Sequence, residues 1–126
     1  VPDIVETIER VARKQRLTIG TVLHAGDGNI HPAILYDRRD AGLVERALAA
    51  GREILHRCIE LGGSPTGEHG IGLEKREYLR ELFGDSDLEL MQELRSALDP
   101  DHRSNPGKVL PTGSGCGEAR APGGAG

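Results

Sequence analysis

The chain has 126 residues, the size of one ordinary domain, and its 20 acidic and 16 basic residues give a net charge of −4 with neutral histidines. This balance argues against a surface for nucleic acids or anionic membranes, because neither polyanion would be attracted to it. Two tyrosines, one phenylalanine and no tryptophan argue against an aromatic stacking platform, and no apolar run reaches the ~20 residues that span a bilayer.

The N-terminal segment predicts an amphipathic helix over residues 3–16, because its apolar residues recur at helical spacing. Asp3 would cap this helix, with Glu6 as its capping-box partner. The first residues are acidic rather than basic, so no signal peptide is expected, and the lack of an initiating Met indicates a processed chain or a fragment. The two cysteines, Cys58 and Cys116, are too few for a disulfide framework and fit a reducing compartment.

Two short segments with β-branched residues, 17–24 and 30–36, predict two antiparallel strands. The Asp27-Gly28 pair between them is typical of a two-residue type I′ turn, in which both central residues need positive φ. With that turn, paired residue numbers sum to 55, and His24 lies directly opposite His31. Two imidazoles so placed could reach one metal ion, since zinc–nitrogen bonds measure about 2.0–2.1 Å. Two half-buried histidines without a ligand remain the alternative.

The remaining elements follow in chain order: a helix over 40–61 that ends at Gly62-Gly63, a tight loop over 64–72, helices over about 73–82 and 87–98, and a turn over 105–108. Asp85 or Ser86 would cap the last helix, and Asp99-Pro100 would end it. Residues 112–126 contain no large apolar side chain and are expected to be disordered. The fold class is therefore α+β, a small antiparallel sheet with helices on one face. Two strands are marginal alone, so we expect the sheet to continue in further chain.

A second cluster lies in the glycine-rich segment GEHGIG, which starts at Gly67. Glycines around an acid–imidazole pair cost entropy, which indicates that the backbone closely approaches another group. Glu68 would be the third ligand of a site with two histidines and one carboxylate, which leaves positions open for substrate. Neighbouring loop residues can point apart, so His69 could face a substrate. Alternatively, the segment is a loop before a helix, and Glu68 interacts favourably with the helix dipole.

Together these motifs resemble the C-terminal domain of the FAD-linked 2-hydroxyacid oxidases. This group contains the glycolate oxidase flavoprotein subunit, D-lactate dehydrogenase and D-2-hydroxyglutarate dehydrogenase. The resemblance covers about residues 1–111 and rests on HAGDGNIHP from His24, GEHGIG with Lys75 after it, Asp99-Pro100, and NPGK from Asn105. It implies that residues 1–111 are the distal, incomplete part of a ferredoxin-like cap domain and that a domain with the vanillyl-alcohol-oxidase type of FAD fold precedes it.

The resemblance also implies roles for single residues. A divalent metal, often zinc, would be held by His24, His31 and Glu68. His69 would take the proton of the substrate hydroxyl while hydride passes from C2 to flavin N5. Asn29 is expected to contact the substrate or the loop that carries His69. Asn105 and Lys108 are expected to touch FAD or its domain.

The implied function is oxidation of a small (D)-2-hydroxy acid, such as glycolate or D-lactate, to the 2-oxo acid. A metal would lower the pKa of the hydroxyl, and a histidine suits a base at neutral pH. The expected partners are the N-terminal FAD-binding domain and an iron–sulfur electron-acceptor subunit. The expected location is the cytoplasm, or the membrane surface if a larger enzyme that contains this chain associates with the membrane. The isolated chain should be catalytically inactive. Alternatives are a stand-alone α+β module that senses a metal or small acid, and a metal-dependent hydrolase.

Overall fold

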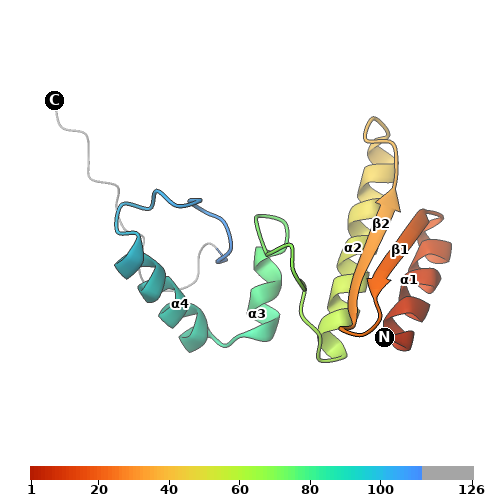
Figure 1. Cartoon of the computed structure of the whole chain (residues 1–126). Coiled ribbons are helices and arrows are strands. Elements are labelled where there is room, and N and C mark those ends of the chain that lie inside the picture. Colours follow the sequence, from red (N-terminus) through yellow and green to blue (C-terminus); the bar gives the residue numbers. More distant parts are fainter. Residues whose placement is uncertain (112–126) are drawn as a thin grey trace. The chain divides into compact units, whose positions relative to one another are not determined.

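The computed structural model describes residues 1–111, so the expectation of a disordered tail over 112–126, and Cys116 with it, lies outside the described residues. Two compact units make up the chain: Val1–His69, and a second that starts at Gly70. The elements are α1 (Pro2–Gln15), β1 (Thr18–His24), β2 (Asn29–Leu35), α2 (Ala41–Glu60), the 3₁₀ turn η1 (Arg76–Tyr78), α3 (Leu79–Leu82) and α4 (Asp85–Leu98) (Figure 1). The predicted α+β class is confirmed. Among the described helices, none has the length and apolar character needed to cross a membrane.

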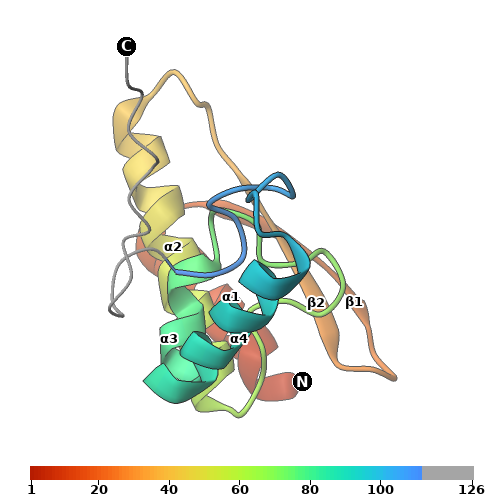
Figure 2. The ribbon, with the colours of Figure 1, turned by 90° about the vertical axis from the view of Figure 1, so that its left-hand side faces the viewer.

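The first unit is a two-stranded antiparallel hairpin whose one face is covered by α1 and α2, which lie side by side (Figures 1 and 2). Its core contains Ile4, Ile8, Val11, Ala50 and Ile54, and the partly buried apolar residues packed against it are Leu17, Ile19, Ile30, Ile34 and Cys58. Side chains alternate along a strand, so residues an odd number of positions from the isoleucines of the same strand point to the other face. There Val22 and Leu35 are 69% and 61% exposed. One face of the hairpin is therefore left open within this unit.

The turn of the hairpin differs from the predicted two-residue type I′ turn. Residues 25–28 form a four-residue loop, in which the N–H groups of Asp27 and Gly28 donate to the His24 carbonyl at 3.1 and 2.9 Å. Gly28 has φ +71°, whereas Asp27 is not in the left-handed region. The observed loop thus needs one left-handed residue, a glycine, whereas a type I′ turn would also force the aspartate into that strained region.

The longer loop changes the register of the strands. His24 pairs with Asn29, and His31 pairs with Val22, so the prediction that His24 lies directly opposite His31 is wrong. The partner of His31 has moved by two residues, and side chains alternate with a period of two. His24 and His31 therefore stay on one face as diagonal neighbours, within reach of long side chains. Both lie on the face that α1 and α2 leave open.

Two predicted helix caps are wrong. Helix α1 begins at Pro2, with Val1 as its N-cap and no capping side chain, because proline's fixed φ suits the first helical position. Asp3 therefore lies inside the first turn, where its carbonyl accepts a hydrogen bond from Thr7 Oγ1 at 2.9 Å. Helix α4 begins at Asp85, with Gly84 as its N-cap rather than Asp85 or Ser86. The Gly84 N–H donates to the carboxylate of Asp87 at 3.0 Å, the bond that the N3 side chain makes in a capping box, and the Asp87 N–H donates to the Gly84 carbonyl at 3.1 Å.

The other boundaries show where glycine decides the structure. Helix α2 is capped by Asp40, which accepts the N–H groups of Gly42 and Leu43, and Gly62 follows its end with φ +79°. This confirms the predicted glycine C-cap. The helix predicted over 73–82 forms only over 76–82, as η1 followed by α3. The first residues of that span remain with the loop, where Gly72 has φ +61° and cannot continue a right-handed helix.

The second unit contains the predicted turn over 105–108, in which the Lys108 N–H donates to the Asn105 carbonyl at 3.2 Å. Side chains from outside the turn hold it in place. Arg95 donates to the carbonyls of Ser104, Asn105 and Lys108, and Asp99 accepts the N–H groups of Arg103 and Ser104. These backbone hydrogen bonds, that of Ser104 first, lower the pKa of Asp99. Helix α4 has no buried residue, so polar contacts rather than a core organise this segment.

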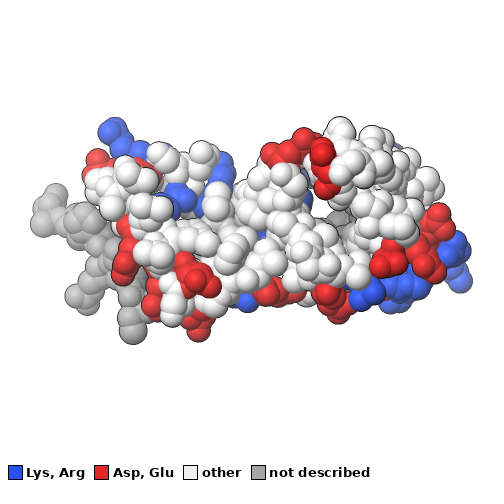
Figure 3. Space-filling view, turned by 60° about the horizontal axis from the view of Figure 1, so that its bottom comes forward, with Lys and Arg blue, Asp and Glu red and all other residues white. Residues whose placement is uncertain are grey.

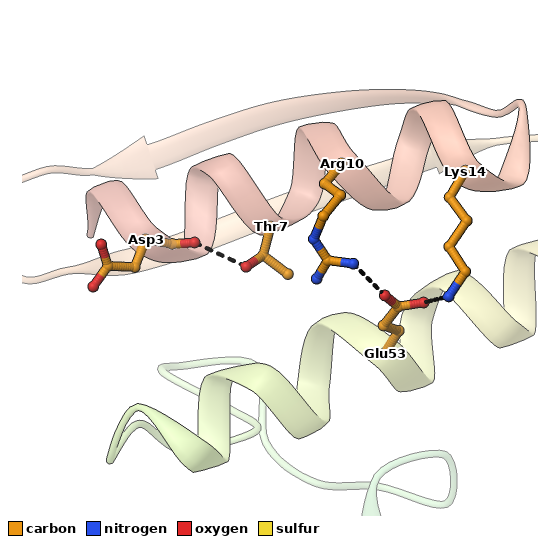
Figure 4. Close-up of polar contacts among 5 residues, drawn as sticks. All are labelled: Asp3, Thr7, Arg10, Lys14 and Glu53. Carbon is orange, nitrogen blue, oxygen red and sulfur yellow. Dashed lines mark hydrogen bonds and ion pairs between the residues drawn. The ribbon is translucent and has the colours of Figure 1, made fainter.

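Helices α1 and α2 are joined by a pair of charge-assisted hydrogen bonds (Figure 4). Glu53 Oε1 accepts from Arg10 at 2.7 Å, and Oε2 accepts from Lys14 at 2.8 Å. Lys14 first and then Arg10 lower the pKa of Glu53 below its ordinary value of 4.5. Figure 3 shows acidic and basic groups close together at the side of the first unit that carries α1. Arg10 and Lys14 of α1 therefore form ion pairs within the first unit.

We expect Glu53→Gln to lower the free energy of unfolding of the chain by about 1 kcal/mol at pH 7, because exposed and half-exposed ion pairs contribute up to about that much each. A carboxyl with a lowered folded pKa stabilises fully above its ordinary pKa, and this contribution is lost as pH falls through the folded value. Urea titrations at pH 7 and pH 3 should therefore show a larger difference between the variant and the wild type at pH 7. Glu45→Gln, on the same helix, is the control. An equal difference at both pH values would contradict the assignment.

Candidate metal centre

Four side chains of the first unit converge on the open face of the hairpin. His24 ends β1 and His31 lies in β2, while Glu68 and His69 come from the loop that follows α2. Glu68 Oε1 lies 3.0 Å from Nε2 of His31, 3.9 Å from Nε2 of His24 and 3.5 Å from Nε2 of His69. Residues more than 35 positions apart in the sequence are thus brought together around one carboxylate oxygen.

Three of these residues offer atoms that fit a common ion. One ligand atom each from His24, His31 and Glu68 lies within 4.8 Å of the other two. A tetrahedral zinc ion with bonds of 2.0–2.1 Å separates neighbouring ligand atoms by about 3.3 Å. The contacts of Glu68 with His31 at 3.0 Å and with His24 at 3.9 Å lie on either side of this value. Imidazole nitrogen and carboxylate oxygen are also the donors that zinc and related divalent ions take. The residues present therefore fit a divalent metal, and three ligands leave coordination positions for a substrate.

His69 lies at the rim of this set. Its ring centroid is 5.1 Å from that of His31, and the two rings are tilted by 32°. The rings of His24 and His31 are 5.4 Å apart and nearly perpendicular. The His69 side chain is 74% exposed, against 26% for His31. An exposed imidazole beside the ligand set can exchange a proton with a bound molecule.

The loop that carries Glu68 closely approaches the hairpin at Gly67. A side-chain carbon at Gly67 would lie 2.6 Å from Cγ and 2.9 Å from Nδ2 of Asn29. Only glycine leaves room for this approach without a shift of one partner. The sequence predicted a close backbone approach in this glycine-rich loop, and Gly67 is the position where it occurs. The side chain of Asn29 contacts the loop, which is one of its two expected contacts.

Within the first unit, the site is open to solvent. The side chains of His24 and Glu68 are 56% and 49% exposed. A shallow groove of about 430 Å³ lies elsewhere, along the start of α2, with Val44, Leu48 and Arg52 among its lining residues. None of the four converging side chains lines it. Contacts between exposed polar groups contribute little in water, and a bound cation or a covering partner would strengthen those of this cluster.

Asn105 and Lys108, the expected cofactor contacts, belong to the second unit. There the Lys108 ammonium donates to Asn105 Oδ1 at 3.1 Å, and Asn105 has φ +47°. The residue that sequence reasoning missed is Arg95, whose guanidinium binds three carbonyls of the segment around this turn. A single arginine in an amphipathic helix carries no signal of such a role.

Comparison with known proteins gives a family and several relatives. The model of the family "FAD linked oxidases, C-terminal domain" matches residues 1–109. The glycolate oxidase subunit GlcD of Escherichia coli is 42% identical over 94% of this chain and 24% of its own length. The GlcD of Bacillus subtilis is 40% identical over 87% of this chain and 23% of its own length. A mitochondrial D-lactate dehydrogenase [cytochrome] of Kluyveromyces lactis is 35% identical over 86% and 18%. The chain thus spans a quarter or less of the length of these relatives.

Proposed function

The chain belongs to the FAD-linked oxidase C-terminal domain family, and from this we propose that it is the metal- and substrate-binding part of a larger flavoprotein. That flavoprotein would oxidise a small (D)-2-hydroxy acid, such as glycolate or D-lactate, to the 2-oxo acid. The similarity to glycolate oxidase subunits and D-lactate dehydrogenases supports this substrate class. An FAD-binding domain of the larger protein would supply the cofactor.

The convergence of His24, His31 and Glu68 on the open face of the hairpin is the observation that carries the proposal. An open sheet face with exposed ligand side chains suits a site that another domain covers. When bound, a divalent metal would act as a Lewis acid toward the substrate's hydroxyl and carboxylate, and the flavin would accept the two electrons and the proton of a hydride. The three side chains would hold the ion and leave one side of it for the substrate.

His69 would act as the base in this arrangement. The mutually close ligand atoms belong to His24, His31 and Glu68, so His69 would remain outside the ligand set. Its side chain is 74% exposed and lies next to Glu68, where it could face a bound molecule. It would accept the hydroxyl proton as the C2–H bond breaks. A positioned base contributes roughly 10²–10⁴-fold to a rate.

Asn105 and Lys108 would contact FAD or the FAD-binding domain. The turn that carries them is held by Arg95 and Asp99 without a packed core, so its form does not depend on burial within this chain. An iron–sulfur subunit would take electrons from the flavin. A reducing cytoplasmic compartment fits the sparse cysteines, and attachment to a membrane would be peripheral.

The full-length protein tests this function directly. We expect it to contain one equivalent of divalent metal, to show the visible spectrum of a flavin, and to reduce a dye acceptor with glycolate or D-lactate. The isolated chain should be inactive with the same acids. Turnover by the isolated chain, or ester hydrolysis by the full-length protein with metal and without flavin, would contradict the proposal.

A further inference from the structure

We propose that Asn29 is a positioning residue, whose amide packs against Gly67 and sets how closely the Glu68 loop approaches the hairpin. This distance then sets the affinity of the site for its metal. The inference rests on the proposed function, because it concerns the ligand set of the same site. It assigns the amide to the loop rather than to the substrate.

The contact joins the two segments that carry the ligands. Asn29 is the first residue of β2, pairs with His24 across the hairpin, and lies two positions before His31 on the same face. Gly67 is bonded directly to Glu68. Any change in the spacing between Asn29 and Gly67 therefore moves the carboxylate relative to both imidazoles.

Polar contacts and one close packing contact join the loop to the strands. Among the described residues, Glu68 and His69 contact the strand histidines, and Asn29 packs on Gly67. The hydrogen bonds within the loop, such as that from the Thr66 N–H to Ser64 Oγ at 3.4 Å, do not reach the hairpin. Packing rather than a backbone ladder thus sets the separation.

The size of the required shift decides the outcome of a substitution. A methyl group at Gly67 would lie 2.6 Å from Cγ of Asn29, whereas carbon atoms in good contact are about 3.5–4.0 Å apart. Either the amide or the loop must therefore move by roughly 1 Å. Metal–ligand distances vary by only about 0.2 Å. A shift of about 1 Å in the loop takes Glu68 out of bonding distance, whereas a shift of the amide alone would leave Glu68 in place.

The test compares zinc affinities of four variants of the full-length protein, measured by competition with a chelator. We expect Gly67→Ala to weaken zinc binding by roughly 10–100-fold, the usual effect of disturbing a group that orients a ligand. In the Asn29→Ala/Gly67→Ala double variant, the added methyl group occupies space vacated by the amide, and most of the affinity should return. Asn29→Ala alone should cost less than Gly67→Ala. Gly26→Ala is the matched control, because a side-chain carbon there meets no atom within 4 Å.

The outcomes separate the two ideas. Absence of any stoichiometric divalent metal from the wild-type protein would overturn the proposed function and this inference with it. Wild-type zinc affinity in Gly67→Ala, or no recovery in the double variant, would overturn the inference alone. A raised KM with unchanged zinc affinity in Asn29→Ala would also overturn it, since that pattern belongs to a substrate contact. Thermal unfolding of the metal-free variants should match the wild type, because the contact lies outside the core.

Discussion

His31→Ala is expected to remove the metal from the full-length protein. His31 is the most buried member of the ligand set, with 26% of its side chain exposed, and its Nε2 lies 3.0 Å from Glu68 Oε1. Its loss leaves one imidazole and one carboxylate, both about half exposed, and two ligands hold zinc poorly. Loss of a group that only orients a ligand costs roughly 10–100-fold in metal affinity, so loss of a ligand should cost more. Elemental analysis after dialysis measures the effect.

His24→Ala should also weaken metal binding, but by a smaller factor than His31→Ala. Its Nε2 lies 3.9 Å from Glu68 Oε1, and its side chain is 56% exposed, so more of its interaction is shared with water. His56→Ala, on α2 and outside the cluster, is the matched control and should keep its metal. Full metal content in both single variants of the strand histidines would refute a site built on this pair.

The hairpin shows how far sequence pattern predicts this site. Alternation along the strands placed His24 and His31 on one face, and this result is independent of the turn as long as the register moves by an even number of residues. Their pairing depended on the turn, and it was wrong. The Asp27-Gly28 pair is compatible with two loops, and the choice depends on whether Asp27 takes a left-handed φ. In the structure Gly28 alone does so, and no sequence rule separates the two cases.

Helix ends were predicted less well than helices. The rules for caps select residues with oxygen-bearing side chains, and Asp3 and Asp85 satisfied them. In the structure Pro2 moves the start of α1 upstream, and Gly84 caps α4 with help from the carboxylate of Asp87. Several residues within one or two positions of a helix start can each serve as its cap, and residue type alone does not decide which one does.

The sequence predicts that a close long-range contact occurs, but not which residue takes part in it. Glycines around Glu68 indicated a close approach, and Gly67 makes one, but the neighbour could have been any element of the fold. That it is Asn29 follows from the register of the hairpin and the path of the chain after α2. The partners of Arg95 could not be predicted either, because they are backbone carbonyls, which every residue has.

His69→Ala is expected to leave the metal in place and to lower kcat of the full-length protein by roughly 10²–10⁴-fold, or about 3–5 kcal/mol of transition-state stabilisation. The mutually close ligand atoms belong to His24, His31 and Glu68, so removal of His69 leaves the donor set complete. KM should change little, because a base interacts most strongly with the proton as it is transferred. Zinc analysis together with steady-state kinetics on glycolate and D-lactate measures both quantities.

Two further outcomes of that substitution would each reject the role of His69. Wild-type turnover would mean that another group takes the proton, and loss of zinc would mean that His69 is a ligand. Exogenous imidazole provides a positive test, because the 74% exposure of the side chain indicates that the space it vacates is open to solvent. A small base that enters this space should restore part of kcat in His69→Ala and none in His31→Ala, where the missing group is a ligand. Rescue confined to His69→Ala separates proton transfer from metal binding within one pair of neighbouring histidines.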